Sequence, residues 1–592
     1  MNTGNNSIVP PVVTDHVPDL TTKVSSSVSG FVTDEFGHPF AAASVQVGNI
    51  TQLTNHFGYF EIKNVQVVKE AATVTVTCQG NRYYKSIKTY VAREGKSAFF
   101  RIKLLPIAAN GTTSNSGTFD AAAGGIISTA NGLSISFPAN SLVDPATGAA
   151  YTGTAVISLF YIDPTSSELV KIMPGDLRGI DTSGHLTGLA SYGMMVAKIW
   201  GNIAGLPPLQ IASGKKATIS FPIPASISGT APATIPLWYF DENNGLWKEE
   251  GSAVKTGNNY VGDVGHFSFW NCDCSIPSLV NFDCTVLSHS IASVIPLENA
   301  IIKLTDLSIP WNFSSVGFTN NLGYVGGRVP ANSQFLLEVF PDNSCTGSIY
   351  AYNFSTAGTD ISLGEITINN TQPSVANITG SVTNCNNAAL NSGYMMLYNG
   401  LDYFTTPINN GTYSISLALC NSSQQNLVLT AIDPVTGWHS SDINQVINPG
   451  ANTISSIQAC TTAFFSAVSN GYFYRPGDSW SITNRAKMLD IIDANSVSTE
   501  LADMGNTYKA VFTVDPSTNL VTVTAAAGAA YAPYTQFDAA LPSTNPGYTP
   551  QWINASQCNN VYDPQTHTYY VRYGYLDFLN RWCVAEEIIQ VL

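Results

Sequence analysis

The strongest constraint on the fold lies near the N-terminus, in residues 29–62. They read SGFVTDEFGHPF at 29–40, ASVQV at 43–47 and TNHFGYFEI at 54–62. Apolar and polar residues alternate within these runs, and Asp, Gly and Pro separate them, which is the pattern of short strands joined by turns. We therefore expect a small β-domain over residues 26–106.

The order of strand, Asp/Gly turn, Pro, alternating strand, polar loop, Gly and alternating strand resembles the carboxypeptidase regulatory-like domain. The resemblance implies a small β-sandwich that is an accessory and not a catalyst. It also implies an envelope or secreted protein, of a kind common in the Bacteroidota. We expect residues 1–25, which are rich in Asn, Thr, Pro, Val and Ser, to form a flexible N-terminal tether. They lack the basic and apolar segments of a signal peptide, so we expect a mature chain whose export signal or lipid-anchor cysteine has been removed.

Composition narrows the class of protein. At 592 residues the chain is too long for a single core. Charged residues make up 11% of the chain, against about 25% in typical soluble domains, so the surface must be built from uncharged polar residues. No apolar run approaches the ~18 residues that cross a bilayer, and we expect no transmembrane segment. The net charge of −15 argues against nucleic acid as a partner.

The ten cysteines predict disulfides in an oxidising compartment, with scattered reduced cysteines as the alternative. Cys272 and Cys274 are too close together for a zinc knuckle, and no His pair lies nearby, so we expect neither a metal site nor a cofactor. The spacing of the cysteines does not determine which of them pair. Within the last domain, Cys558 and Cys583 are the expected pair.

The rest of the chain also reads as β. Asp-Pro turns begin at Asp144, Asp433, Asp515 and Asp563, and each is predicted to form a hairpin tip.

A second domain is expected over residues 118–274. It contains LSISFPANSL at 133–142, ATISFP at 217–222, LWYFD at 237–241 and GHFSFWN at 265–271. This order resembles the β-domain of ankyrins and netrin receptors, and the related segment of cartilage intermediate layer protein.

Residues 275–368 and 369–460 are interpreted as a diverged repeat of two further small sandwiches. The last domain, 461–592, differs, because RAKMLDII at 485–492 has helical composition and spacing. Near its end, an Asp-Pro turn at Asp563 is followed by the aromatic run TYYVRYGY at 568–575. This pattern resembles terminal domains of Bacteroidota surface lipoproteins linked to glycan capture. The expected fold class is therefore all-β: tandem small sandwiches, with a mostly-β C-terminal domain that carries a short helix.

One tripeptide is a candidate site for self-cleavage of the chain. Certain relatives of the ankyrin-type β-domain cleave their own chain between Phe and Ser of a His-Phe-Ser motif, and His266, Phe267 and Ser268 stand at the matching place. The Ser268 hydroxyl could attack the Phe267 carbonyl, with His266 as base, and water would hydrolyse the ester. The alternative is an ordinary strand, with His266 and Ser268 on one face and Phe267 and Phe269 in the core.

Aromatic residues of the last domain are the second candidate. Tyr531, Tyr534 and Trp552 lie in loops rich in Pro, Asn and Gly, where they could stack on sugar rings. Packing within the domain is the competing interpretation.

These patterns predict an extracytoplasmic protein at the cell surface or outer membrane, or secreted. We expect a non-catalytic binding or adhesion protein, with glycan as the ligand class and the early domains as a stalk of domains strung through short linkers. The alternatives are a self-processing surface protein cut after Phe267, and an accessory subunit of an envelope complex with a protein partner.

Overall fold

The structure is a computed structural model, and it describes part of the chain between residues 16 and 591. Within that range, the residues left undescribed are 38, 41–42, 56, 79–82, 108–115, 202–207, 290–293, 310–313, 341–346, 370–374, 401, 420–423, 434–438, 461–464, 475–480, 483–489, 494–495, 504–505, 516–519, 526–535, 539–551, 555–558, 564–567 and 577–581. For the strands after residue 460 we describe the backbone only.

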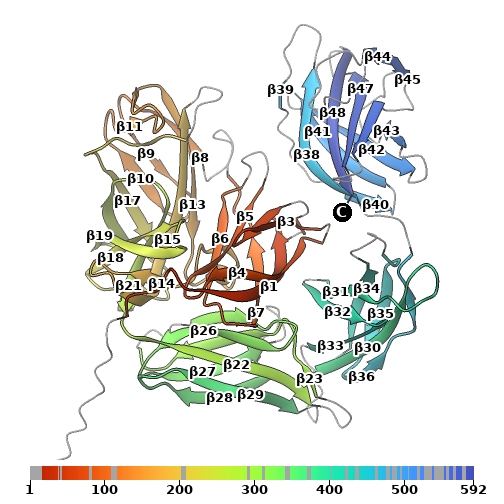
Figure 1. The fold of residues 1–592 in the computed structure, drawn as a ribbon. Coiled ribbons are helices and arrows are strands. Elements are labelled where there is room, and N and C mark those ends of the chain that lie inside the picture. The colour runs from red at the N-terminus through yellow and green to blue at the C-terminus, as the bar shows by residue number, and fades with distance from the viewer. Residues whose placement is uncertain are drawn as a thin grey trace, which may run out of the picture.

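The described chain is almost entirely β, as predicted, and its strands form five groups that we call the first to fifth domains (Figure 1). The first domain contains β1 (Lys23–Thr33), β2 (Ser44–Val47), β3 (Ile50–Leu53), β4 (Tyr59–Val68), β5 (Ala72–Thr77), β6 (Ser86–Tyr90) and β7 (Ser97–Lys103). Its two sheets have the orders β4-β1-β7 and β3-β2-β5-β6, and apolar side chains from both sheets form one core between them.

The second domain is larger. It contains β8 (Ser116–Asp120), β9 (Gly125–Ser128), β10 (Ser134–Phe137), β11 (Leu142–Val143), β12 (Ala150–Tyr151), β13 (Thr154–Ile162), α1 (Leu169–Ile172), β14 (Arg178–Ile180), β15 (Leu186–Gly201), β16 (Gln210–Ile211), β17 (Ala217–Pro222), the 3-10 helix η2 (Ser228–Thr230), β18 (Thr234–Asp241), β19 (Leu246–Thr256), β20 (Asn259–Val264) and β21 (Phe269–Ile276). An 11-stranded sheet and a small sheet of order β12-β11-β16 make up this domain.

The third and fourth domains repeat the strand order of the first, although in the fourth the pairing of two neighbouring strands joins both halves into one eight-stranded sheet. The third contains β22 (Leu279–His289), β23 (Val294–Pro296), β24 (Ile301–Asp306), β25 (Ser314–Phe318), β26 (Tyr324–Pro330), β27 (Gln334–Phe340), β28 (Tyr350–Ser355) and β29 (Ile361–Asn369). The fourth contains β30 (Val375–Thr383), β31 (Ser392–Tyr398), β32 (Tyr403–Asn409), β33 (Thr412–Ala418), β34 (Gln425–Ile432), β35 (Ile443–Ile447), β36 (Gly450–Thr453) and β37 (Ile457–Gln458). In all three domains the opening strand pairs antiparallel with one partner and parallel with a closing strand: β1 with β4 and β7, β22 with β26 and β29, and β30 with β33 and β36.

The fifth domain contains β38 (Phe465–Tyr474), β39 (Ser481–Ile482), β40 (Asp490–Asp493), β41 (Ser496–Asp503), β42 (Asn506–Asp515), β43 (Leu520–Ala525), β44 (Gln536–Asp538), β45 (Trp552–Asn554), β46 (Asn559–Asp563), β47 (Thr568–Leu576) and β48 (Trp582–Val591). The predicted helix over 485–492 is wrong at its end, because residues 490–492 belong to β40. Residues 485–489 lie outside the described residues. A short apolar run does not distinguish a strand from a helix by its spacing.

A shared turn explains why the first and third domains fold alike. TNHFGY at 54–59 and TNNLGY at 319–324 occupy the same position in the two folds. The Asn55 side-chain oxygen accepts hydrogen bonds from the backbone N–H groups of residues 57 and 59, and Asn320 does the same for residues 322 and 324. Gly58 and Gly323 both have a φ of +71°, which a glycine adopts without steric cost.

The Asp-Pro turn at Asp144 is confirmed as a hairpin tip, between the antiparallel strands β11 and β12. The turns that follow Asp433, Asp515 and Asp563 lie outside the described residues, but the strands on either side of them pair antiparallel, as β34/β35, β42/β43 and β46/β47. In the first of the four turns, Asp144 accepts from the backbone N–H of Ala146 at 2.9 Å, and Gly148 has a φ of +70°.

The first four domains are not strung in a line. The first domain lies at the centre, with the second, third and fourth around it (Figure 1). Buried residues of the first and second domains share one apolar cluster, and residues of the first, third and fourth share another. Members of the second cluster include Phe31, Phe318 and Met396. The expectation of a stalk of separate domains is therefore wrong for these four.

Polar contacts join the same domains. The Tyr84 hydroxyl donates to the Ser158 carbonyl at 2.9 Å, between the first and second domains. The Asn320 amide donates to the Ser97 carbonyl at 2.7 Å, between the third and first. The Asn55 amide donates to the Tyr394 hydroxyl at 2.7 Å, between the first and fourth. The two turn asparagines thus shape their own turns and also contact a neighbouring domain.

Part of the predicted flexible tether is bound to this assembly. His16 Nε2 lies 2.7 Å from Glu70 Oε2, and the His16 carbonyl accepts from the backbone N–H of Leu186 at 2.7 Å. Glu70 also pairs with Arg328 of the third domain at 3.2 Å. Residues 16–22 therefore dock where the first three domains meet, while residues 1–15 lie outside the described residues. A chain terminus that is tied down in this way is ordered.

Candidate functional site

The His-Phe-Ser tripeptide lies in a loop and not in a strand. β20 ends at Val264 and β21 begins at Phe269, so residues 265–268 connect them. β20 pairs with β17 and β19, whereas β21 pairs with β15 and β18. The interpretation of 266–268 as part of an ordinary strand is therefore wrong. The same interpretation also placed Phe267 and Phe269 in the core. That part agrees with the structure, because Phe269 is buried and Phe267 packs on Phe137 with ring centroids 5.6 Å apart.

Two aromatic rings hold the His266 side chain. The Tyr239 ring meets it edge-on at 4.8 Å, and the Trp270 ring lies 5.0 Å away. The Trp270 indole N–H also donates to the His266 carbonyl at 3.0 Å. Glu250 lies 3.6 Å from the imidazole, but both side chains are more than a third exposed, so this ion pair is weak.

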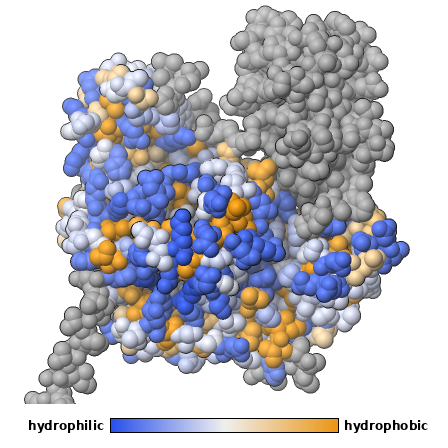
Figure 2. Space-filling view, in the orientation of Figure 1, coloured by the Kyte–Doolittle hydropathy of each residue, from blue (hydrophilic) through white to orange (hydrophobic). Residues whose placement is uncertain are grey.

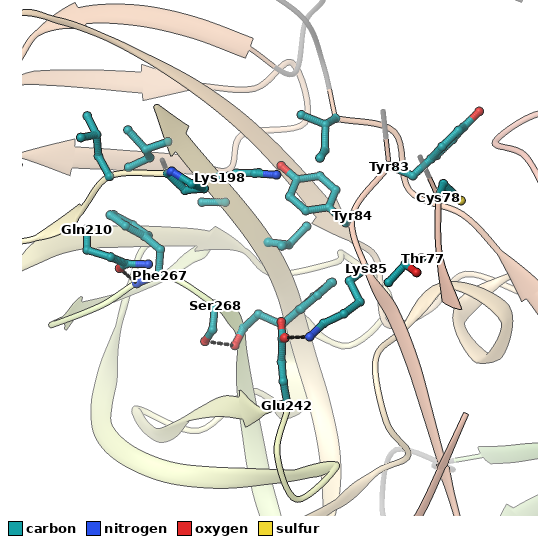
Figure 3. A pocket seen from close by; sticks show the side chains of 17 residues that line it. Thr77, Cys78, Tyr83, Tyr84, Lys85, Lys198, Gln210, Glu242, Phe267 and Ser268 are labelled. Atoms are coloured by element: carbon teal, nitrogen blue, oxygen red, sulfur yellow. Dashed lines mark hydrogen bonds and ion pairs between the residues drawn. The ribbon is translucent and has the colours of Figure 1, made fainter. Parts of the chain in front are cut away.

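Ser268 is directed toward the following residue. Its hydroxyl donates to the Phe269 carbonyl at 3.0 Å, and the Phe267 N–H donates to the Gln210 side chain at 3.1 Å (Figure 3). Among the hydrogen bonds of the described residues, none joins the His266 ring to the Ser268 hydroxyl. None of the three has a positive φ or a cis peptide bond. A general base must lie within hydrogen-bonding reach of the proton it removes, and here the imidazole is held elsewhere.

A pocket of about 310 Å³ borders this loop (Figure 3). Residues of the first domain line one side of it, including Tyr83 and Tyr84, and the 267–269 segment lines the other. An ion pair between Lys85 and Glu242 joins the two domains at the pocket. The Phe267–Ser268 peptide is thus beside a cavity that water can enter.

The predicted sugar-binding aromatics belong to the least described part of the chain. Tyr531 and Tyr534 lie outside the described residues. Trp552 begins β45, and its backbone pairs with Asp538 of β44. The prediction that these side chains bind a glycan stays a prediction.

Sequence reasoning missed a disulfide between two of the described residues, Cys385 and Cys460. Cys385 follows β30 and Cys460 follows β37, and these two strands pair in parallel. A signal was available: if the fourth domain copies the first, its opening and closing strands are neighbours. The predicted pair of Cys558 and Cys583 is untested, because Cys558 lies outside the described residues and Cys583 is described only by its backbone in β48.

Three other cysteines are reduced in the structure: Cys272, Cys274 and Cys284. Burial raises the pKa of the Cys284 thiol to about 12 and also raises the pKa of Cys272. Thiols with raised pKa values are poor nucleophiles and poor metal ligands. Among the described residues, no group of His, Cys, Asp or Glu side chains is arranged to hold a metal ion. In the same part of the chain, no helix has the length and apolar composition to cross a bilayer.

Comparison with known proteins finds similarity over parts of the chain. No protein-family model matches this chain. Over 110 residues it is 29% identical to cartilage intermediate layer protein 2 of Mus musculus, which covers 19% of this chain and 9% of that protein.

Several solved structures, pilins among them, align with parts of the chain. Shaft pilin SpaA of Lactobacillus rhamnosus GG aligns at 11% identity over 32% of this chain and 99% of its own, with a TM-score of 0.15. The TIE protein of Bacillus anthracis aligns at 9% identity over 76% of this chain and 74% of its own, with a TM-score of 0.13. Superpositions this poor carry no argument about function.

Proposed function

We propose that this protein is a non-catalytic, extracytoplasmic binding or adhesion protein of a bacterial envelope, and that its ligand is a glycan. The observation that carries the proposal is the architecture. Three domains of one sandwich topology and a larger β-domain form a single block around the first domain, and a fifth β-domain follows it. The block serves as a base, and the fifth domain presents the binding loops.

Two further features support this location and role. The Cys385–Cys460 disulfide, next to the entry into the fifth domain, fits an oxidising compartment. The sequence of the first domain resembles the carboxypeptidase regulatory-like domain, which is an accessory module. A lipid anchor in a Bacteroidota-type envelope belongs to the same proposal.

A glycan screen on the full chain tests the ligand class. We expect binding that falls about tenfold or more in Trp552→Ala, since truncating an aromatic anchor of a binding site costs about 2 kcal/mol or more. Tyr352→Ala is the matched control, because Tyr352 of the third domain is 46% exposed and far along the chain from the fifth domain. Equal binding by all three proteins, or no binding to any glycan, would count against the proposal.

A protein partner is less well supported by the surface. The exposed large apolar side chains include Phe36, Ile126 and Tyr352, and they come from different domains. The face shown in Figure 2 mixes hydrophilic and hydrophobic residues. A surface that binds another protein of an envelope complex would instead have its exposed apolar residues in one large contiguous patch.

Self-processing is the second candidate, because the Phe267–Ser268 peptide lies in a loop beside a pocket. Strand pairing would keep the halves of a cut chain together, since β21 is held between β15 and β18. Only a denaturing measurement therefore reports cleavage.

We predict that denaturing mass spectrometry will find one species at 63.1 kDa, because the Ser268 hydroxyl is bonded to the Phe269 carbonyl and the imidazole is held by aromatic rings. Two fragments, 1–267 and 268–592, that disappear in Ser268→Ala would contradict this expectation and establish self-processing.

A further inference from the structure

A second cavity, of about 710 Å³, lies where the first, second and third domains meet. Its walls include β7 of the first domain, residues 164–178 of the second, and β25 and β26 of the third. Pockets of 300–1,000 Å³ are of the size that encloses small organic ligands. The cavity is separate from the pocket beside Ser268 and from the fifth domain.

Basic residues outnumber acidic ones in the wall of this cavity, unlike in the chain as a whole. The chain has 25 Lys and Arg residues against 40 Asp and Glu. Seven of those cations line the cavity with a single acid, Asp176. The seven are Lys88, Arg93, Lys96, Arg101, Arg178, Lys303 and Arg328. Such a concentration in a low-dielectric recess attracts anions.

Ion pairs between domains explain part of this cluster. Arg93 pairs with Asp283, Arg101 with Asp402, and Arg328 with Glu70. If the cations only joined the domains, their hydrogen-bonding groups would be used up by these partners.

Some hydrogen-bonding groups of these arginines are left without a partner. Within the described part of the chain, three buried guanidinium nitrogens have no acceptor: Arg101 Nε, Arg178 Nη2 and Arg328 Nε. The side chains that carry them are 8%, 4% and 8% exposed. A buried donor without an acceptor costs about 1–3 kcal/mol. All three donors belong to arginines that line this cavity, as does one unpartnered acceptor, Asp176 Oδ1.

Arg178 pairs with Asp176 at 2.7 Å, and Lys303 pairs with Glu338 at 3.6 Å. Lys88 and Lys96 have no carboxylate partner among the described residues. The Lys88 ammonium donates to two backbone carbonyls, those of Val170 and Met173. Lys96 lies over the Tyr324 ring, 5.0 Å from its centroid. Aromatic rings of Phe99, Phe318 and Tyr324 are part of the same wall.

We propose that this cavity binds a small organic oxyanion, a molecule with carboxylate or sulfate groups on a ring that contacts the aromatic wall. Guanidinium groups recognise such oxygens with charge-assisted, often bidentate hydrogen bonds. The ligand would supply acceptors to the arginine N–H groups and would hold the three domains together. This site does not depend on the glycan proposed for the fifth domain.

Titration calorimetry on the full chain tests the proposal, with digalacturonate as the carboxylate probe and N-acetylglucosamine 6-sulfate as the sulfate probe. Galactobiose is the neutral control, and inorganic sulfate reports whether the anion alone suffices. We expect at least one charged sugar to bind and galactobiose not to. The better of the two probes identifies the anionic group.

Amino-acid substitutions test whether the probe binds in this cavity. Lys96→Gln changes an exposed side chain and should fold normally, and Arg328→Gln removes one of the unpaired donors. We expect each to weaken binding about tenfold, which is the effect of losing one charge-assisted hydrogen bond. Lys216→Gln, an exposed lysine of the second domain with the same change of charge, should bind as the wild type does. No binding of either charged probe, or equal losses in all three variants, would overturn the proposal. Trp552→Ala should leave this binding unchanged.

Discussion

Gly58→Ala is expected to lower the free energy of unfolding by about 3 kcal/mol or more. Gly58 has a φ of +71°, and a left-handed conformation costs an L-residue about 1–2 kcal/mol. A Cβ atom would also lie 2.2 Å from the Val32 carbonyl oxygen, so β1 would have to move. Overpacking of this kind adds about 1–3 kcal/mol. Urea denaturation followed by tryptophan fluorescence measures the loss.

Gly37→Ala is the matched control for this prediction. Gly37 has a φ of +91°, but no atom lies within 4 Å of the position its Cβ would take. This variant should therefore show only the conformational cost, about 1–2 kcal/mol. Gly323 of the third domain repeats the geometry of Gly58, with its Cβ 2.2 Å from the Val286 carbonyl oxygen, and should repeat its effect. Equal losses for Gly37 and Gly58 would show that the close approach of β1 is not important.

Lys88→Met is expected to abolish a large pH dependence of stability. Lys88 is 2% exposed, and its burial lowers the pKa of the ammonium from 10.5 to about 7. Below pH 7 both the folded and unfolded states are protonated, so the folded state carries the full cost of the buried charge. Between pH 7 and 10.5 the unfolded state binds the extra proton, and stability therefore rises with pH.

The size of this effect can be measured as a difference between the two proteins. From pH 7 to pH 9 the wild type should gain about 2 kcal/mol relative to Lys88→Met, given about 1.4 kcal/mol per pKa unit. Urea unfolding at pH 6, 7.5 and 9 measures it. The exposed variant Lys216→Met should run parallel to the wild type. A difference between wild type and Lys88→Met that stays constant over this range would show that Lys88 keeps its charge when folded.

The turns could be predicted from the sequence where residues within the same turn determine its shape. The Asn and Gly of the 54–59 turn act through their own backbone and neighbouring residues, so the sequence pattern is sufficient. The same holds for Asp144, whose side chain accepts from the residue two positions later. These rules need no knowledge of distant residues.

The assembly of the domains was not predictable in this way. Phe31 reads as an ordinary strand residue, yet it is buried against Tyr403 of the fourth domain, with ring centroids 6.0 Å apart. One signal was present in the sequence. Phe31 and Val32, like Phe99 and Phe100, are consecutive apolar residues, and a strand with apolar residues on both faces is covered on both. Which domain covers the second face depends on contacts between distant segments.

The candidate site shows the same limit. The tripeptide was found from its residues, but a tripeptide does not reveal whether the chain there is a strand or a loop. Its location in the 265–268 loop follows from β20 and β21, which lie at separate places in one large sheet. The cationic cavity was missed because its seven cations come from three domains and lie between positions 88 and 328.

Small-angle X-ray scattering of the full chain tests most directly whether the domains form one block. A compact chain of this length has a radius of gyration of about 25 Å, and with projecting second and fifth domains we predict about 30 Å. Domains strung through linkers would give a value above about 45 Å, with the scattering of an extended, flexible chain. That second result would contradict the central position of the first domain, and with it the cavity between the first three domains.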